Sequence, residues 1–244
     1  MFIEICANSY QSAINAQKAG ADRIELCSEL AIGGITPSYG LVKKVKQELE
    51  IPVHVLIRPR SGDFTYAHSE FDVMKKNIEL CKKLRCEGIV SGILNSNNTI
   101  DIKRTKELVE LAKPMRFTFH RAFDWVGNPL EEIEGLIKIG VDYVLTSGQE
   151  NQAILGLKLL KKLKDKGSGK VEIMPGAGVN IENILAFKNA GFNQIHFSAT
   201  SIHTTQNNIK VTMNSPRFFN ETVVAVSDLN KINKMINLVR SQGN

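Results

Sequence analysis

Two short segments near the start of the chain share a pattern that limits how the chain can fold. Residues 2–6 (FIEIC) and 22–27 (DRIELC) are apolar runs in which a glutamate is followed two positions later by a cysteine. Side chains alternate between the faces of a strand, so each glutamate shares a face with its cysteine. Residues 8–20 between them are typical of a helix, with Ser9 as N-terminal cap and Gly20 as stop. This order predicts a right-handed βαβ unit whose two parallel strands, and their Glu/Cys pairs, lie side by side.

The same unit recurs along the chain. Strands are expected at residues 2–6, 22–27, 53–58, 88–92, 116–120, 142–146, 170–174 and 194–198. Helices are expected at residues 8–20, 38–49, 70–85, 102–112, 129–139, 151–164, 181–190 and 229–240. Strands that alternate with helices predict a parallel sheet. Eight such strands in 244 residues favour an α/β fold of the TIM (β/α)8 barrel type, as one domain over residues 1–244, ahead of an open doubly wound sheet.

Residues 200–228 interrupt this regularity. The segment is polar and shows no helical period. A connection of this length in a compact domain is commonly a lid or a binding loop, and this is one expectation for it. The other is that residues 209–213 form a strand of a small additional hairpin.

Charge and cysteine usage exclude several classes of function. The 31 lysines and arginines exceed the 25 acidic residues, for a net charge of +6. They alternate with acidic residues along the expected helices, without an aromatic-rich motif, so we expect solvated helix faces and no nucleic-acid partner. No signal peptide and no apolar run of membrane-spanning length is found, so no membrane association is expected. Four cysteines are too few for a disulfide scaffold, which favours the reducing cytoplasm.

Polar side chains gather where the expected strands end, which is where barrel enzymes carry their active sites. At strand ends lie Cys6, Cys27, Arg58, His120, Ser147 and Ser198, followed in the loops by Arg60, Asp63 and Arg121. Period two places further polar groups on the same faces, namely Glu4, Glu25, His54 and Thr118. If these faces point inward the barrel interior is charged, and we expect Arg58 or Arg60 to compensate Glu4 or Glu25. An internal ionic network without any chemistry is the alternative.

The two cysteines at the ends of the first two strands form a candidate metal site. Parallel strands lie about 4.8 Å apart, so thiols at equal height would lie within a few ångströms of each other. Such a pair is compatible with Cu(I), a soft ion, and equally with a redox disulfide. Either cysteine could instead be a small buried apolar residue. Cys81 and Cys86, near the end of an expected helix, are interpreted as packing residues.

A second candidate site involves the last two strands. Gly176 and Gly178 follow the seventh strand and Ser198 ends the eighth, and these loops form the usual phosphate site of this barrel class. His120 with Arg121 beside it could supply an acid or base and a guanidinium for an enolisation, aldol or lyase reaction. No lysine ends a strand, which disfavours a Schiff-base aldolase, and HExxH zinc spacing is absent.

Seven segments together resemble the CutC family. They are residues 4–6 (EIC), 23–27 (RIELC), 33–38 (GGITPS), 57–64 (IRPRSGDF), 118–124 (TFHRAFD), 144–149 (VLTSGQ) and 174–179 (MPGAGV). The chain departs from the family pattern at Ser61, where a glycine is common. The resemblance implies a cytoplasmic, single-domain TIM barrel with a role in copper homeostasis, often a homo-oligomer (dimer or higher). It also implies Cys6 and Cys27 as Cu(I) ligands, with no organic cofactor.

Two hypotheses follow from these residues. In the first, the chain is a copper homeostasis protein that binds Cu(I) through Cys6 and Cys27. In the second, it is an enzyme of the lyase, isomerase or hydrolase type that acts on a small anionic metabolite, for instance a phosphorylated one. In this enzyme the catalytic residues would be His120, Glu25 and Arg58, and the anion would be held by Arg58, Arg60, Arg121, Gly176, Gly178 and Ser198.

Overall fold

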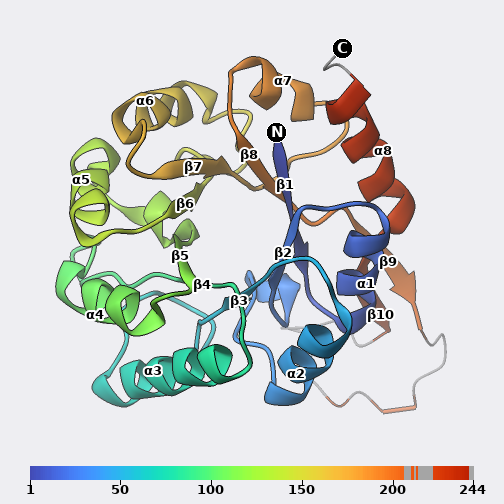
Figure 1. The fold of residues 1–244 in the computed structure, drawn as a ribbon, viewed down its shortest axis with the longest axis horizontal. Helices are drawn as coiled ribbons and strands as arrows, with labels where there is room; N and C mark the ends of the chain where they lie inside the picture. Colours follow the sequence, from blue (N-terminus) through green and yellow to red (C-terminus); the bar gives the residue numbers. More distant parts are fainter. Residues whose placement is uncertain (206–209, 212, 214–221, 242–244) are drawn as a thin grey trace.

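The computed structural model describes residues 1–205, 210–211, 213 and 222–241. Its centre is one sheet of eight parallel strands in the order β7-β6-β5-β4-β3-β2-β1-β8. The strands are β1 (Phe2–Ala7), β2 (Arg23–Leu26), β3 (Val53–Leu56), β4 (Gly88–Ser91), β5 (Arg116–Phe119), β6 (Tyr143–Thr146), β7 (Glu172–Pro175) and β8 (Gln194–Phe197). The edge strands β7 and β8 lie next to each other, so the sheet curls into a barrel (Figure 1). The predicted TIM barrel is confirmed.

Helices surround this barrel on the outside (Figure 1). They are α1 (Tyr10–Lys18), α2 (Tyr39–Glu48), α3 (His68–Lys83), α4 (Ile102–Ala112), α5 (Pro129–Ile139), α6 (Leu157–Gly167), α7 (Ile184–Asn189) and α8 (Leu229–Ser241). Two short 3-10 helices, η1 (Leu30–Ile32) and η2 (Arg121–Trp125), follow β2 and β5. The Ser9 cap is confirmed, because its side chain accepts a hydrogen bond from the Ser12 amide.

Two of the expected helices, α6 and α7, begin at least three residues later than predicted. Residues 151–156 form bends and turns before α6, and the backbone at Gly156 passes so close to Ser147 that an added Cβ would lie 2.0 Å from the Ser147 carbonyl oxygen. Before α7, the Asn180 side chain accepts a hydrogen bond from the Glu182 amide, and the Asn183 side chain accepts one from the Asn180 amide. Such local bonds from asparagine side chains compete with helical geometry.

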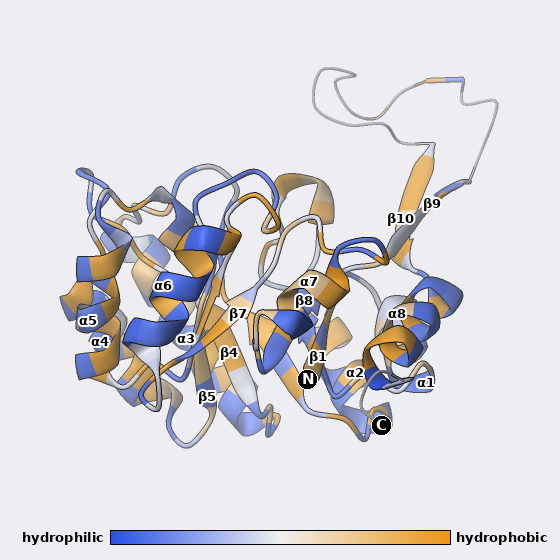
Figure 2. Cartoon of the chain, turned by 90° about the horizontal axis from the view of Figure 1, so that it is seen from above, coloured by the Kyte–Doolittle hydropathy of each residue, from blue (hydrophilic) through white to orange (hydrophobic). Residues whose placement is uncertain are grey.

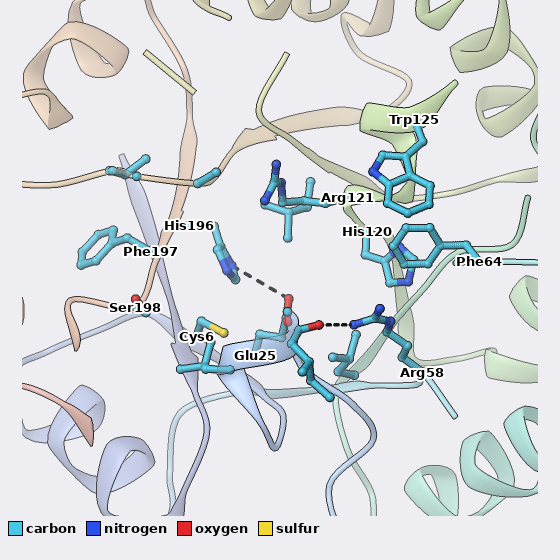
Figure 3. A pocket seen from close by; sticks show the side chains of 18 of the residues that line it. Cys6, Glu25, Arg58, Phe64, His120, Arg121, Trp125, His196, Phe197 and Ser198 are labelled. Atoms are coloured by element: carbon cyan, nitrogen blue, oxygen red, sulfur yellow. Dashed lines mark hydrogen bonds and ion pairs between the residues drawn. The ribbon is translucent and has the colours of Figure 1, made fainter. Parts of the chain in front are cut away.

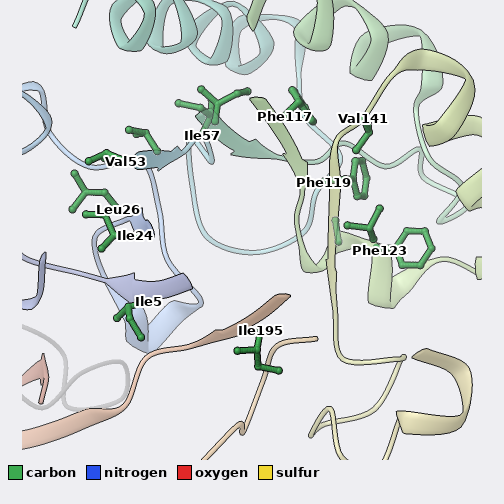
Figure 4. Close-up of a cluster of buried hydrophobic side chains, with 14 of the residues drawn as sticks. Ile5, Ile24, Leu26, Val53, Ile57, Phe117, Phe119, Phe123, Val141 and Ile195 are labelled. Atoms are coloured by element: carbon green, nitrogen blue, oxygen red, sulfur yellow. The ribbon is translucent and has the colours of Figure 1, made fainter. Parts of the chain in front are cut away.

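The two faces of the strands have opposite character. The outward face packs against the helices and is apolar, with Ile5, Ile24 and Phe117 among its fully buried side chains (Figure 4). The inward face carries many buried polar side chains, as the period-two pattern predicts, beside an apolar cluster that includes Leu56 and Val90. Its buried polar side chains include Glu4, Arg23, Glu25, His54, Thr118 and His196. The charged barrel interior is therefore confirmed.

A loop is predicted over residues 200–228, but in the structure the two ends of this segment pair with each other as one hairpin. Strand β9 (Thr200–Thr204) pairs antiparallel with β10 (Val223–Ser227), and the hairpin projects away from the barrel (Figure 2). Its base is fixed to β1, because the Ser227 hydroxyl donates a 3.0 Å hydrogen bond to the Cys6 carbonyl. Part of the predicted lid, residues 206–209, 212 and 214–221, lies outside the described residues. Of the predicted strand at 209–213, residues 210, 211 and 213 are described and form bends and no strand, while residues 209 and 212 lie outside the described residues.

No helix in the described part of the chain is long and apolar enough to cross a membrane.

Candidate functional site

The two cysteines at the barrel mouth meet, although not through the register that the sequence pattern predicts. Glu4 lies opposite Arg23 and Cys6 opposite Glu25, so the two Glu/Cys pairs are offset by two residues and are not level. The sulfur atoms of Cys6 and Cys27 nevertheless lie 3.7 Å apart. A disulfide bond requires about 2.05 Å, and both thiols are free.

A carboxylate and an imidazole complete the group around Cys6. Cys6, Glu25 and His196 are buried and place one potential ligand atom each within 4.8 Å of one another. Figure 3 shows His196 directed toward Glu25, and the distance from Nδ1 to Oε2 is 3.9 Å. Sequence reasoning missed His196. The signal was available, because His196 precedes Ser198 by two positions and therefore shares its face.

The cation that compensates the buried Glu4 is Arg23. Its Nε lies 2.5 Å from Glu4 Oε2, and both side chains are almost fully buried. His196 Nδ1 lies 2.7 Å from the other oxygen, Oε1. The prediction that Arg58 or Arg60 would compensate Glu4 or Glu25 is therefore wrong.

Both of these arginines follow the end of β3, and their guanidinium groups contact loops. Arg58 donates hydrogen bonds of 2.8, 2.8 and 2.9 Å to the carbonyl oxygens of Ile32, Gly34 and Gly62. Arg60 forms ion pairs with Asp63 and Glu70, which stabilise the loop before α3.

Burial and contacts with neighbouring side chains set the pKa values of these groups. Burial alone would raise the pKa of Glu4, but the Arg23 charge and the hydrogen bond with His196 lower it to about 2. Burial raises the pKa of Glu25 to about 7. Burial opposes protonation of His196, but its contacts with Cys6 and Glu4 and the Glu25 charge raise its pKa well above the usual value. The Cys27 contact and burial raise the pKa of Cys6.

A cavity of about 480 Å³ opens at this end of the barrel, and ligand sites commonly have this size. All three catalytic candidates, His120, Glu25 and Arg58, line it (Figure 3). The other predicted site residues in its lining are Cys6, Arg121, Gly178 and Ser198. The structure thus brings seven of the predicted residues together around one space.

Three predicted site residues lie outside the lining of this cavity. Cys27 is fully buried and packs against Cys6 with Leu56 and Val90. The Gly176 amide donates a hydrogen bond to the Thr146 carbonyl, and an added Cβ would lie 2.5 Å from the Leu145 side chain, so this glycine serves packing. Arg60 forms its ion pairs with Asp63 and Glu70, away from the cavity lining.

Two aromatic residues that sequence reasoning did not select form one wall of the cavity. Phe64, in the loop after β3, and Trp125, at the end of η2, meet edge to face with ring centroids 4.8 Å apart. The Trp125 side chain remains exposed. The cavity therefore offers an apolar wall as well as polar groups.

The fold and the site define a TIM-barrel protein with a buried Cys–Glu–His group at the mouth of the barrel. The CutC family model matches residues 1–201. The chain belongs to the CutC family.

Known relatives are similar over most of their length. The human copper homeostasis protein cutC homolog is 41% identical over 236 residues, covering 94% of this chain and 86% of the relative. A CutC family protein of Proteus mirabilis is 47% identical over 197 residues, covering 81% and 78% of the two chains. The solved structure of CutC from Streptococcus agalactiae is similar with a TM-score of 0.77 and 34% identity, covering 81% of this chain and 98% of that one. Thiamine phosphate pyrophosphorylase from Pyrococcus furiosus shares the fold at a TM-score of 0.62 and 14% identity, with 100% and 97% of the chains covered.

Proposed function

We propose that this protein acts in copper homeostasis by binding Cu(I) through the thiolates of Cys6 and Cys27. The observation that carries the proposal is the 3.7 Å approach of the two buried sulfur atoms at the mouth of the barrel. The copper homeostasis role that names the human relative agrees with it. Free thiols suit a reducing compartment, which supports a cytoplasmic location.

The donor set fits Cu(I) better than a hard cation. Thiolate is the soft ligand that Cu(I) prefers, and an imidazole is a suitable further ligand. Both are present, because the His196 ring and the Cys6 sulfur lie within the same 4.8 Å group. Magnesium and calcium would instead need several oxygen ligands, whereas Glu25 supplies the carboxylate oxygen of this three-residue group and the other two members supply sulfur and nitrogen.

The two cysteines differ in their access to solvent. Cys6 lines the cavity and is 7% exposed, whereas Cys27 lies behind it and is fully buried. An ion that arrives through the cavity therefore meets Cys6 first. Cys27 lies close enough to this thiol to share the ion with it. His196 also lies close enough, but its raised pKa means that its ring must first release a proton.

Binding must be coupled to proton release. The pKa of Cys6 is raised by the Cys27 contact and by burial, so the metal-free thiol keeps its proton at neutral pH. Metal ligation requires the thiolate. Glu25, whose pKa is about 7 and which belongs to the same group, is a suitable acceptor for this proton.

The chain supplies a matched control for testing the thiol pair. Fully reduced wild-type protein should compete with a Cu(I) chelator for one ion per chain, and the Cys6→Ser/Cys27→Ser variant should lose this competition. The Cys81→Ser/Cys86→Ser variant also removes two buried thiols, but these pack in the apolar core and should leave the competition unchanged. If the first variant still competes like wild type, or the second loses binding equally, the thiol pair is not the copper site.

A further inference from the structure

The cavity at the mouth contains a buried positive charge that no carboxylate compensates. Arg58 is 6% exposed, and its guanidinium donates hydrogen bonds to three carbonyl oxygens. Among the described residues no acidic group lies within ion-pair distance of it, and the three acceptors of its hydrogen bonds are neutral carbonyl oxygens. A buried, uncompensated charge is costly, so an anion at this place would be stabilised.

An unpartnered hydrogen-bond donor, His120, lies beside Arg58. The Nδ1 atom of His120 accepts a 3.2 Å hydrogen bond from the Ala122 amide, so the ring proton lies on Nε2. Nε2 is buried and lacks a partner in the described part of the chain. Burial and the Arg58 charge lower the pKa of His120 to about 3, so the ring is a neutral donor at physiological pH. Phe64 packs against both side chains, so a ligand would reach them past the edge of this ring.

Arg121 extends into the same cavity from the side of η2 (Figure 3). Asp124 and Ser147 hold one edge of its guanidinium, through Nε at 2.8 Å and Nη2 at 3.2 Å. Its Nη1 donates to none of the described residues, and the side chain is 45% exposed. A positioned guanidinium with one free edge is suited to bind an anionic oxygen.

Backbone amides from the loop after β7 add further donors. Ala177, Gly178 and Val179 line the cavity, and the first two have φ values of +95° and +65°. Their three amides donate no hydrogen bond to any residue that the structure describes. Successive amides in such a backbone form a concave anion-binding surface.

We propose that this cavity binds a small organic anion, a phosphate or carboxylate on an apolar ring-sized body. Arg58, Arg121, His120 and the amides of residues 177–179 would face the anionic group. The edge-to-face pair of Phe64 and Trp125 would contact the apolar body. Neither role uses the thiols, although Cys6 lines the same cavity.

Calorimetric titration with four simple probes tests the proposal. Phenyl phosphate and benzoate carry both parts, inorganic phosphate carries the anion alone, and benzyl alcohol carries the ring alone. Wild-type protein should bind phenyl phosphate or benzoate more tightly than either partial probe, and the tighter of the two identifies the anionic group. If neither binds at millimolar concentration, the proposal is wrong.

Variants of exposed residues separate binding from folding. Arg121→Gln should weaken the better probe about tenfold or more, as expected for the loss of a charged hydrogen bond. Arg116→Gln removes an exposed arginine that is also paired with an aspartate, Asp142, but outside the cavity, and should leave binding unchanged. Trp125→Ala should weaken phenyl phosphate but not inorganic phosphate. Cys6→Ser/Cys27→Ser should retain anion binding even if it loses copper. Equal losses in the Arg121 and Arg116 variants would overturn the proposal.

Discussion

Replacing Arg23 with methionine is expected to lower the free energy of unfolding by about 3–5 kcal/mol, the usual cost of removing one partner of a buried ion pair. The substitution would leave the Glu4 carboxylate with no exposed surface and without its nearest cation. It would also remove the 3.0 Å hydrogen bond from Arg23 to Gln194. Urea denaturation at pH 7 measures the effect.

Two controls show whether the loss comes from the uncompensated charge. The double variant Arg23→Met/Glu4→Gln should recover part of the lost stability, because no charged carboxylate is then left without its partner. Arg116→Met breaks an ion pair whose arginine is 65% exposed, and should cost about 1 kcal/mol or less. A cost for Arg23→Met no larger than that for Arg116→Met would contradict the role assigned to Arg23.

Glu25→Gln is expected to stabilise the protein at pH 8 and to leave its stability nearly unchanged at pH 4. The pKa of Glu25 is raised from 4.5 to about 7 in the folded state by burial, and its Oε2 has no hydrogen-bond partner in the described structure. A raised pKa means that the stabilising effect of the protonated form is fully present below pH 4.5 and is lost as the pH rises through 7. One pKa unit corresponds to 1.36 kcal/mol, so the shift from 4.5 to about 7 lowers the free energy of unfolding of the wild type by about 3 kcal/mol at high pH relative to low pH.

Thermal or urea unfolding of both proteins between pH 4 and pH 8 measures this difference. Glutamine resembles the protonated carboxyl at every pH, so the gap between variant and wild type should widen across this window. Glu182→Gln, at an exposed position on the surface, should show no such widening. A gap for Glu25→Gln that stays constant with pH would show that Glu25 ionises in the folded protein as it does in the unfolded chain.

The alternation of side chains along strands was sufficient to predict the barrel and its charged interior. The alternation assigns a residue to one face of the sheet, but it does not give the register between neighbouring strands. It therefore cannot identify which side chains contact each other. Arg23 shares the inward face with Glu25 and Cys27, yet only the two-residue offset between β1 and β2 places it opposite Glu4. Arg58 was a plausible partner by residue type, but it lies beyond the end of β3, where loop carbonyls are nearer than the interior.

The details of the mouth depend on loop conformation, which residue patterns do not specify. The segments after β3 and β5 bring Phe64 and Trp125 together, although 61 positions separate them in the chain. The carbonyl groups that hold Arg58 come from turns at Ile32, Gly34 and Gly62. His196 could have been found from its spacing to Ser198, whereas the position of Gly176 in the packed sheet could not.

X-ray absorption spectroscopy of the protein loaded with one Cu(I) per chain tests the proposed copper site most directly. Two sulfur neighbours around copper, both lost in the Cys6→Ser/Cys27→Ser variant and kept in the Cys81→Ser/Cys86→Ser variant, are the expected result. A copper environment of nitrogen and oxygen alone, or one that the first variant leaves unchanged, would show that the paired thiols at the barrel mouth do not hold the metal.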